Sequence, residues 1–146
     1  MKIGYFCNTT NWMHKPFHKL LDETREITEY CDQNKWDSIW FTEHHFNHEG
    51  MECCTNPLML GTDAAARTKK IRIGQAANII TFHNPIRLAE DIATLDQLSK
   101  GRVDVGIGRG IYGREAIHMN IEADLKDQAK NFRLFEETLT ILKKAW

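Results

Sequence analysis

The sequence predicts an α/β fold in which four parallel β-strands alternate with four helices. Short runs of β-favouring residues recur at intervals typical of strand–helix–strand units, and segments with helical spacing of apolar residues lie between them. Two Asn-Pro pairs, which begin at Asn56 and Asn84, mark helix starts 28 residues apart, because asparagine caps free backbone amides and proline suits the first helical position. This alternation favours parallel strands joined by right-handed crossovers.

The first part of the chain contains two expected strands and one expected helix. Residues 2–7 form a short strand, and residues 8–16 form a polar loop. A helix is expected over residues 17–34, because apolar side chains recur there at helical spacing with charged residues between them. A second strand covers residues 38–42, and the polar segment 47–55 is expected to be an irregular loop.

The second part repeats the alternation. The helix after the first Asn-Pro pair leads to a strand over residues 71–80, and the helix after the second pair ends at Lys100-Gly101. A fourth strand is expected over residues 103–107, and a last helix over residues 123–146. That helix has an apolar stripe made of Phe132, Phe135, Leu139, Leu142 and Trp146.

The number of units predicts half of a (β/α)8 TIM barrel, because a complete barrel usually takes about 250 residues and this chain has 146. We expect one domain over residues 1–146. An open doubly wound sheet is the competing architecture. The first and fourth strands would be exposed edges with buried-type sequences, so we expect oligomerisation, as a homodimer, to complete or cover the half-barrel.

Composition narrows the classes of function. The net charge of −1 gives no electrostatic reason to expect a nucleic acid or an anionic membrane as a partner. No run of 18 apolar residues is present, and residues 1–6 are too short for the apolar core of a signal peptide, so we expect a cytoplasmic protein. The four cysteines show no framework spacing and are expected to be reduced thiols.

Reactive side chains follow the second strand directly. Glu43, His44 and His45 come where a buried strand meets solvent, and the carboxyl ends of parallel strands are where α/β proteins place their chemistry. By the two-residue period of a strand, His45 is expected on the side opposite to His44, facing the helices or a subunit contact. Since adjacent histidines then cannot easily share an ion, we expect no metal site.

A glycine cluster follows the fourth strand. Gly108, Gly110 and Gly113 match the G-x-G-x-x-G pattern of dinucleotide-binding folds. That pattern requires an immediate helix and then a strand ending in an acid about 20 residues further on, and the sequence lacks both. The cluster is therefore either a flexible turn or a backbone without bulky side chains that a ligand can approach, with Arg109 beside it.

Several segments together resemble a known family. They are Trp40–Phe46, Asn56-Pro57, Ala65–Gly74, His83–Asp91, Leu95–Arg102 and Gly106–Gly110, and in this order they are similar to the amino-terminal half of the bacterial luciferase-like flavin-dependent monooxygenases. The resemblance implies a (β/α)8 barrel and reduced FMN as cosubstrate, with a deazaflavin as the alternative and a flavin reductase as the source. It also implies insertion of one oxygen atom of O2 into a small organic substrate such as an aldehyde.

The resemblance also implies roles for individual residues. His44 matches the catalytic histidine, and an imidazole suits proton transfer near neutral pH. Glu43 matches a residue near the flavin ring, although a buried carboxylate paired with an arginine is an alternative. Arg109 matches an arginine that binds the FMN phosphate, with the Ile111 amide beside it. Ala76-Ala77 matches a cis peptide under the ring, and an ordinary trans strand is the alternative.

Two observations leave the function open. Gly108 stands where the luciferase α subunit has a reactive cysteine, which argues against a strictly light-emitting enzyme. The resemblance ends after the fourth strand–helix unit, so the expected function is a flavin-dependent monooxygenase or a truncated half of one. The alternative is a non-catalytic flavin-binding or assembly module, a truncated paralogue without turnover.

Overall fold

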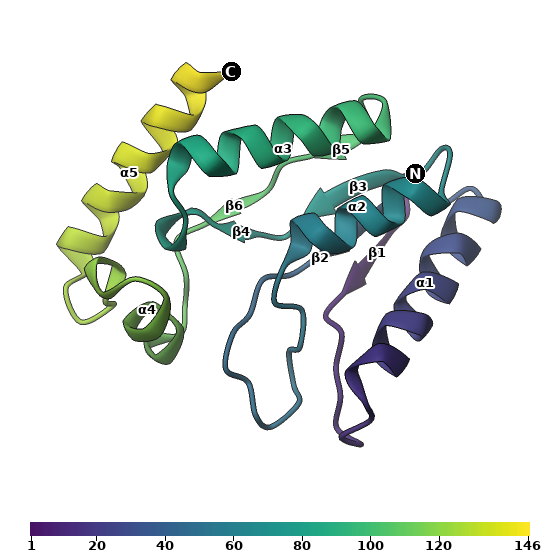
Figure 1. The fold of residues 1–146 in the computed structure, drawn as a ribbon, viewed down its shortest axis with the longest axis horizontal. Helices are drawn as coiled ribbons and strands as arrows, with labels where there is room; N and C mark the ends of the chain where they lie inside the picture. The colour runs from purple at the N-terminus through teal and green to yellow at the C-terminus, as the bar shows by residue number, and fades with distance from the viewer.

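The computed structural model describes residues 1–146, and its strands are all parallel (Figure 1). Four strands form the main sheet in the order β1 (Gly4–Cys7), β2 (Ser38–Phe41), β3 (Arg72–Gln75) and β5 (Val103–Asp104). Two short strands, β4 (Asn78–Ile79) and β6 (Ile107–Gly108), form a second sheet. Strand order follows chain order, as in a barrel, whereas a doubly wound sheet reverses direction at a switch point. The half-barrel prediction is therefore confirmed over the doubly wound alternative.

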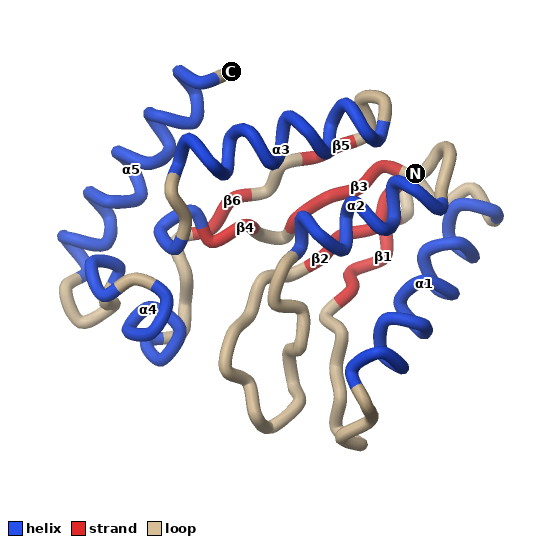
Figure 2. The backbone as a smooth tube through the Cα atoms, in the orientation of Figure 1, coloured by secondary structure: helices blue, strands red, loops and turns tan.

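The chain also has five helices and two short 3-10 turns, of which α4, η2 and α5 follow the last strand (Figure 2). They are α1 (Phe17–Gln33), α2 (Pro57–Arg67), η1 (Ile80–Phe82), α3 (Pro85–Ser99), α4 (Gly113–Met119), η2 (Ile121–Ala123) and α5 (Gln128–Ala145). Helix α2 packs between α1 and α3, and α5 packs on α3. None of these helices has the length and apolar character needed to cross a membrane.

Local signals set the starts of α2 and α3. The Asn56 side chain accepts a hydrogen bond from the Met59 amide at 2.9 Å, and the Asn84 side chain accepts from the Ile86 and Arg87 amides at 3.0 and 3.1 Å. Both helices have proline in their first turn, as predicted. Helix α3 ends at Ser99, and the capping residue Lys100 adopts the left-handed conformation with φ of 61°.

The register of the sheet separates two faces. Tyr5, Ile39, Ile73 and Val103 form one row across the strands, and Phe6, Trp40, Gly74 and Asp104 form the next. The first row faces the helices, where Ile39 and Ile73 are fully buried in a core with residues of α1, α2 and α3. The second row lines the opposite, concave face, and Phe6 is 59% exposed there.

Trp40 occupies space on the concave face that only glycine leaves free. A Cβ atom added at Gly74 would lie 2.2 Å from the Trp40 ring, a distance that no real contact allows. The pairing of these two residues in register therefore requires a residue without a side chain on β3.

Three elements differ from the prediction. The expected strand over residues 71–80 is divided into β3 and β4, and the expected strand over 103–107 into β5 and β6. Where the strands divide, the backbone segments around Gly106 and Gln75 come very close, since a Cβ atom at Gly106 would meet the Gln75 carbonyl oxygen. The last helix begins at Gln128, not at residue 123, because Asp127 caps the Lys130 amide at 2.9 Å.

Packing of the last helix is also less complete than its sequence pattern suggested. Of the predicted apolar stripe, Leu142 is buried, whereas Phe132 and Trp146 are 50% and 58% exposed. The sequence predicts no helix directly after the glycine cluster, yet residues 113–119 form the seven-residue helix α4. That helix lies at the carboxyl edge of the sheet, where it contributes to the candidate site.

Candidate functional site

Glu43 is the buried centre of a histidine cluster beyond the end of β2. It is 2% exposed, and its carboxylate accepts a hydrogen bond from the Ile79 backbone amide at 2.6 Å. The Nε2 atoms of His83 and His45 lie 2.8 and 3.1 Å from the same carboxylate oxygen. Burial favours the neutral acid, but the hydrogen bonds from both imidazoles and the amide outweigh it and lower the pKa of Glu43.

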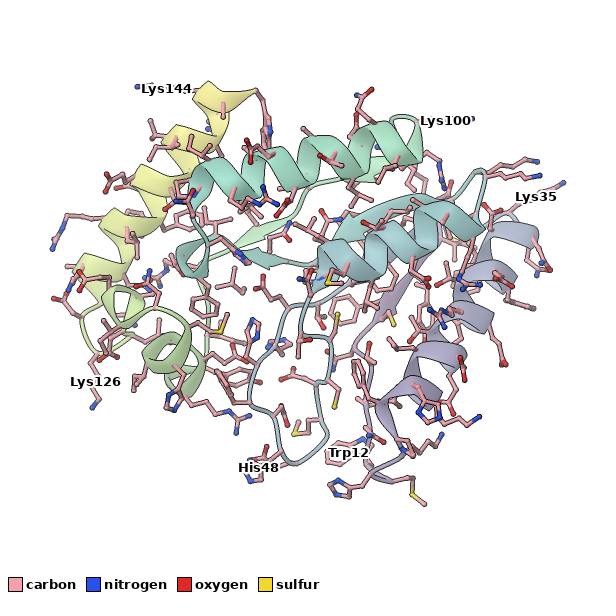
Figure 3. The ribbon with its side chains drawn as sticks, viewed as in Figure 1. Trp12, Lys35, His48, Lys100, Lys126 and Lys144 are labelled. Atoms are coloured by element: carbon pink, nitrogen blue, oxygen red, sulfur yellow. The ribbon has the colours of Figure 1, made fainter.

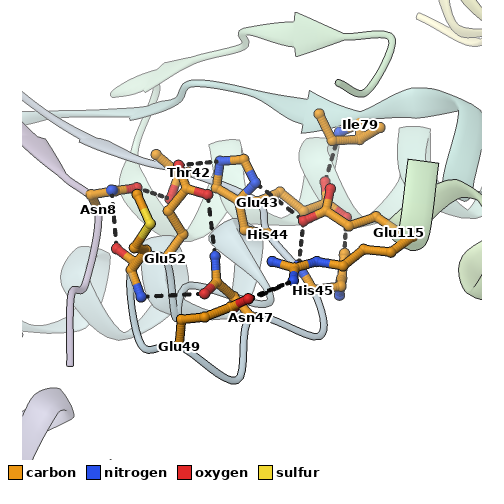
Figure 4. Close-up of polar contacts among 12 residues, drawn as sticks. Asn8, Thr42, Glu43, His44, His45, Asn47, Glu49, Glu52, Ile79 and Glu115 are labelled. Atoms are coloured by element: carbon orange, nitrogen blue, oxygen red, sulfur yellow. Dashed lines mark hydrogen bonds and ion pairs between the residues drawn. The ribbon is translucent and has the colours of Figure 1, made fainter. Parts of the chain in front are cut away.

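His44 lies between two carboxylates (Figure 4). Its Nδ1 atom is 3.3 Å from Oε1 of Glu115, and its Nε2 atom is 3.5 Å from Oε1 of Glu52. Burial disfavours the charged imidazolium, but the hydrogen bond with Glu115 and the charges of the surrounding glutamates outweigh it and raise the pKa of His44. The His44 side chain is 13% exposed, so these interactions are only partly screened by water.

Helix α4 places Glu115 in this cluster. The Glu115 side chain is 1% exposed and also accepts the His45 backbone N–H at 2.8 Å. The ring of Tyr112, the residue before α4, is tilted against the His44 ring, and the two ring centroids are 5.5 Å apart. Arg114 pairs with Glu49 at 3.2 Å and attaches the outer side of α4 to the loop after β2. The site is therefore assembled from segments about 70 residues apart in sequence.

The loop that carries Glu52 is fixed by the loop after β1. The Asn11 amide donates to the Gly50 carbonyl at 2.6 Å, and the Cys53 amide donates to the Thr9 carbonyl at 3.2 Å. Figure 3 shows the tips of these two loops next to each other, with Trp12 on one and His48 on the other, at the end of the molecule away from α3. Backbone hydrogen bonds thus hold the segment that carries Glu52 in place.

Small residues lie between β3 and β4 and within and just after β6. The peptide bond between Ala76 and Ala77 is cis, the geometry that the family resemblance implied. A Cβ atom at Gly108 would lie 3.3 Å from the Ala77 Cβ atom and 3.1 Å from the Ile79 side chain, so β4 and β6 are closely packed there. Gly110 adopts a positive φ of 87°, which favours glycine.

Arg109 and Ile111 follow β6. The Arg109 guanidinium carbon lies 5.8 Å from the centre of the Phe132 ring on α5, and its backbone carbonyl accepts the Thr81 hydroxyl at 3.2 Å. The Ile111 side chain is 71% exposed. Because all strands are parallel, the segments with His44 and Arg109 leave the sheet at the same edge, as expected.

The expected surroundings of His45 are wrong. Its ring does not face the main helices or a subunit contact but bonds Glu43 and is 11% exposed. The two histidine rings have different partners, since the His44 ring faces Glu115 and Glu52. An arginine partner for Glu43, the alternative considered above, is also wrong, since histidines occupy that position.

Sequence reasoning missed three members of the cluster: Glu52, His83 and Glu115. Glu115 lies in a helix of seven residues, too short to show a clear helical period. His83 directly precedes the Asn-Pro pair that starts α3. A polar side chain between an expected strand and the next helix was therefore a signal by which the sequence could have identified it.

The fold and site together define a parallel (β/α) barrel segment with acid–base side chains at its carboxyl edge, the arrangement of barrel enzymes. Comparison with known proteins specifies the family: the model described as luciferase-like monooxygenase matches residues 1–146. The chain belongs to the luciferase-like, flavin-dependent monooxygenase family.

Individual relatives agree with this assignment. The chain is 35% identical to the alkanal monooxygenase alpha chain of Photorhabdus laumondii, over 79% of this chain and 32% of the relative. It is 32% identical to the oxygenase component of the flavin-dependent trigonelline monooxygenase of Acinetobacter baylyi, over 88% of this chain and 34% of the relative.

A solved structure shares the fold. The oxygenating constituent of 3,6-diketocamphane monooxygenase of Pseudomonas putida, in complex with FMN, superposes with a TM-score of 0.90 and 26% identity, over 100% of this chain and 39% of that one. This chain therefore spans about a third of the length of the curated relatives described above.

Proposed function

We propose that this chain forms the histidine-bearing part of an FMN-dependent monooxygenase, as one domain over residues 1–146, and that His44 is its catalytic acid–base residue. The observation that carries the proposal is the position of His44 at the carboxyl edge, held between two carboxylates and 13% exposed. A histidine in such surroundings is suited to move a proton in a site that excludes most of the water.

The residues present fit a flavin mononucleotide. Ala76 and Ala77 carry no side chain beyond Cβ, so a planar ring system can approach their backbone closely. Arg109 is a suitable partner for the phosphate, because a guanidinium forms forked contacts with phosphate oxygens, and the Ile111 amide would add a donor. Glu43 would support the ring side of the site through its two histidine partners.

Bound in reduced form, FMN supplies the two electrons that activate O2. One oxygen atom then enters the substrate, an aldehyde becoming a carboxylic acid, and the other leaves as water. His44 would hold or deliver a proton at the reacting centre. An aldehyde is proposed as the substrate because one relative is named an alkanal monooxygenase. A reduced deazaflavin is the alternative cosubstrate.

A separate flavin reductase is the proposed source of reduced FMN. Two relatives carry the names oxygenase component and oxygenating constituent, which describe one part of a system with several proteins. We also propose a homodimer in which α2 and α3 form the contact. Exposed apolar residues on these helices support it: Met59, Ile86 and Leu98 are 70%, 53% and 57% exposed.

The test combines oxygen uptake with flavin binding. The protein is mixed with FMN, NAD(P)H, a flavin reductase and a panel of aldehydes, and oxygen consumption beyond that of the reductase alone is recorded. His44→Ala should abolish substrate-dependent uptake while leaving FMN binding, followed by flavin fluorescence, unchanged. His48→Ala, in which the lost side chain is 83% exposed on the same loop, is the matched control and should keep full uptake.

Each alternative result has a distinct meaning. Uptake that is unchanged in His44→Ala contradicts the catalytic role. FMN binding without uptake by any of the aldehydes favours the non-catalytic flavin-binding module. For the phosphate site, Arg109→Gln should weaken binding of FMN and leave binding of riboflavin, which has no phosphate, at the same strength. Light scattering that shows a stable monomer at micromolar concentration would contradict the dimer.

A further inference from the structure

The two nitrogens of the His44 ring face acids from different parts of the chain. Glu115 approaches Nδ1 from α4 at 3.3 Å, and Glu52 approaches Nε2 from the loop after β2 at 3.5 Å. A neutral imidazole has one N–H and one lone pair, so one of its nitrogens would present a lone pair to a carboxylate. The imidazolium has two N–H groups and suits both neighbours. The geometry alone therefore favours the protonated ring.

Glu52 is held in place toward His44. The Asn47 side-chain amide donates to Oε2 of Glu52 at 3.4 Å, which leaves Oε1 directed at the imidazole. Asn47 in turn accepts the Met51 amide at 3.3 Å, so the loop orients its own glutamate. With a side chain 15% exposed, Glu52 also lies in a less screened position than an ordinary surface acid.

We propose that Glu52 is a positioning residue that, with Glu115, holds the His44 ring between two carboxylates, so that His44 stays protonated at neutral pH and enters the reaction as a proton donor. The charge state is a property of this chain alone. The role as proton donor rests on the proposed function.

The other ionisable groups near His44 either also favour its protonated form or do not affect it. Glu43 adds a further negative charge, and with Glu52 and Glu115 it raises the pKa of His44 against the effect of burial. Tyr112 stacks on the ring from the N-terminal end of α4, and its hydrogen bond with Glu52 raises the pKa of the tyrosine. Arg114, the cation on α4, is paired with Glu49.

The charge state can be measured without flavin. Heteronuclear NMR of the ring nitrogens and carbons, with His44 identified by the loss of its signals in His44→Gln, gives the titration midpoint of that ring. Glu52→Gln keeps the size and an acceptor oxygen but removes the charge, so the midpoint should move to lower pH. A weakening of proton affinity of about tenfold is the expected size for one neighbouring carboxylate. Glu52→Gln/Glu115→Gln should move it further.

Glu49→Gln is the matched control, because it makes the same chemical change on the same loop at an acid that pairs with Arg114 and not with His44. Its midpoint should equal that of the unmodified protein. A midpoint that is equally unchanged in Glu52→Gln overturns the proposal. Should Glu115→Gln fail to fold, because that carboxylate is 1% exposed, the single change at Glu52 decides.

The role in the reaction has a separate readout. In the coupled oxygen-uptake assay, the alkaline limb of the rate–pH profile should move to lower pH in Glu52→Gln by the shift found by NMR. An alkaline limb that does not move excludes the role as proton donor. A protein without any uptake whose NMR midpoint still depends on Glu52 contradicts the proposed function and leaves the charge state of His44 established.

Discussion

Oε1 of Glu43 lies 2.8 Å from Nε2 of His83, so that a carboxylate beyond β2 and an imidazole after η1 form an ion pair at the carboxyl edge of the sheet. The Glu43 side chain is 1% exposed and the His83 side chain 32%. Burial disfavours the imidazolium, but the hydrogen bond and charge of Glu43 outweigh it and raise the pKa of His83. The same interaction thus acts to lower the pKa of Glu43 and to raise the pKa of His83.

The stability of the protein should depend on pH through this pair. Glu43 has a lowered pKa, so its contribution is complete above the ordinary value of 4.5 and is lost as the pH falls through the lowered pKa. His83 has a raised pKa, so its contribution is complete below 6.5 and is lost as the pH rises through the raised pKa. The contribution of the pair to the unfolding free energy should be largest between these two values.

Urea unfolding at a series of pH values measures this dependence. The difference in unfolding free energy between the unmodified protein and His83→Gln should be largest in that window and should decrease on the alkaline side. His18→Gln, at an exposed position of α1, is the control and should show a difference that is small at every pH. If the unfolding free energy of His83→Gln falls at alkaline pH as much as that of the unmodified protein, the decrease belongs to other groups.

Removal of the central carboxylate should be costly. Glu43→Ala leaves two imidazoles and the Ile79 amide without their acceptor in a buried site, so we expect a loss of about 3 kcal/mol or more in unfolding free energy. The measurement is equilibrium urea unfolding followed by circular dichroism. Glu49→Ala removes an acid whose side chain is 45% exposed and should change the same quantity much less. Equal effects of the two changes would contradict the central role of Glu43.

A side chain at Gly74 should disturb the concave face. In Gly74→Ala the new methyl group would overlap the Trp40 ring, and such overpacking typically costs about 1–3 kcal/mol. Tryptophan fluorescence should change together with the unfolding free energy. Gly113→Ala is the control, because a Cβ atom there meets no atom within 4 Å. A Gly74→Ala protein with unchanged stability would show that Trp40 can leave its place freely.

Phe132 should influence the phosphate site through Arg109. The guanidinium carbon lies 5.8 Å from the ring centre, and a cation–π contact at an exposed site contributes about 0.5–1 kcal/mol. In Phe132→Leu we therefore expect FMN binding to weaken by about two- to fivefold, measured by flavin fluorescence. Riboflavin, which lacks the phosphate, should bind as before. A loss that is equal for both flavins would place the effect of Phe132 outside the phosphate contact.

Features governed by neighbouring residues could be predicted from the sequence. The starts of α2 and α3 depend on an asparagine and a proline in adjacent positions, and both lie where expected. The parallel order of the strands follows from the spacing of the elements. The position of His44 beyond β2 follows from the polar residues at the end of an apolar run.

Features governed by distant contacts could not be predicted. The division of the third and fourth strands depends on the close approach of Gly106 to Gln75, residues from different strands. The carboxylate on Nδ1 of His44 comes from Glu115, 71 positions away, on a helix with too few residues for a periodic pattern. The bond of the His45 ring to Glu43 was also missed, because β2 ends at Phe41 and the irregular backbone beyond it has no pattern that fixes side-chain partners.

The hydrogen bond from the His45 backbone amide to Glu115, at 2.8 Å, joins the end of β2 to α4. An amide in such a hydrogen bond exchanges its proton with deuterium only when the bond is broken. The exchange rate at this single backbone position should therefore report how firmly α4 is docked on the end of β2.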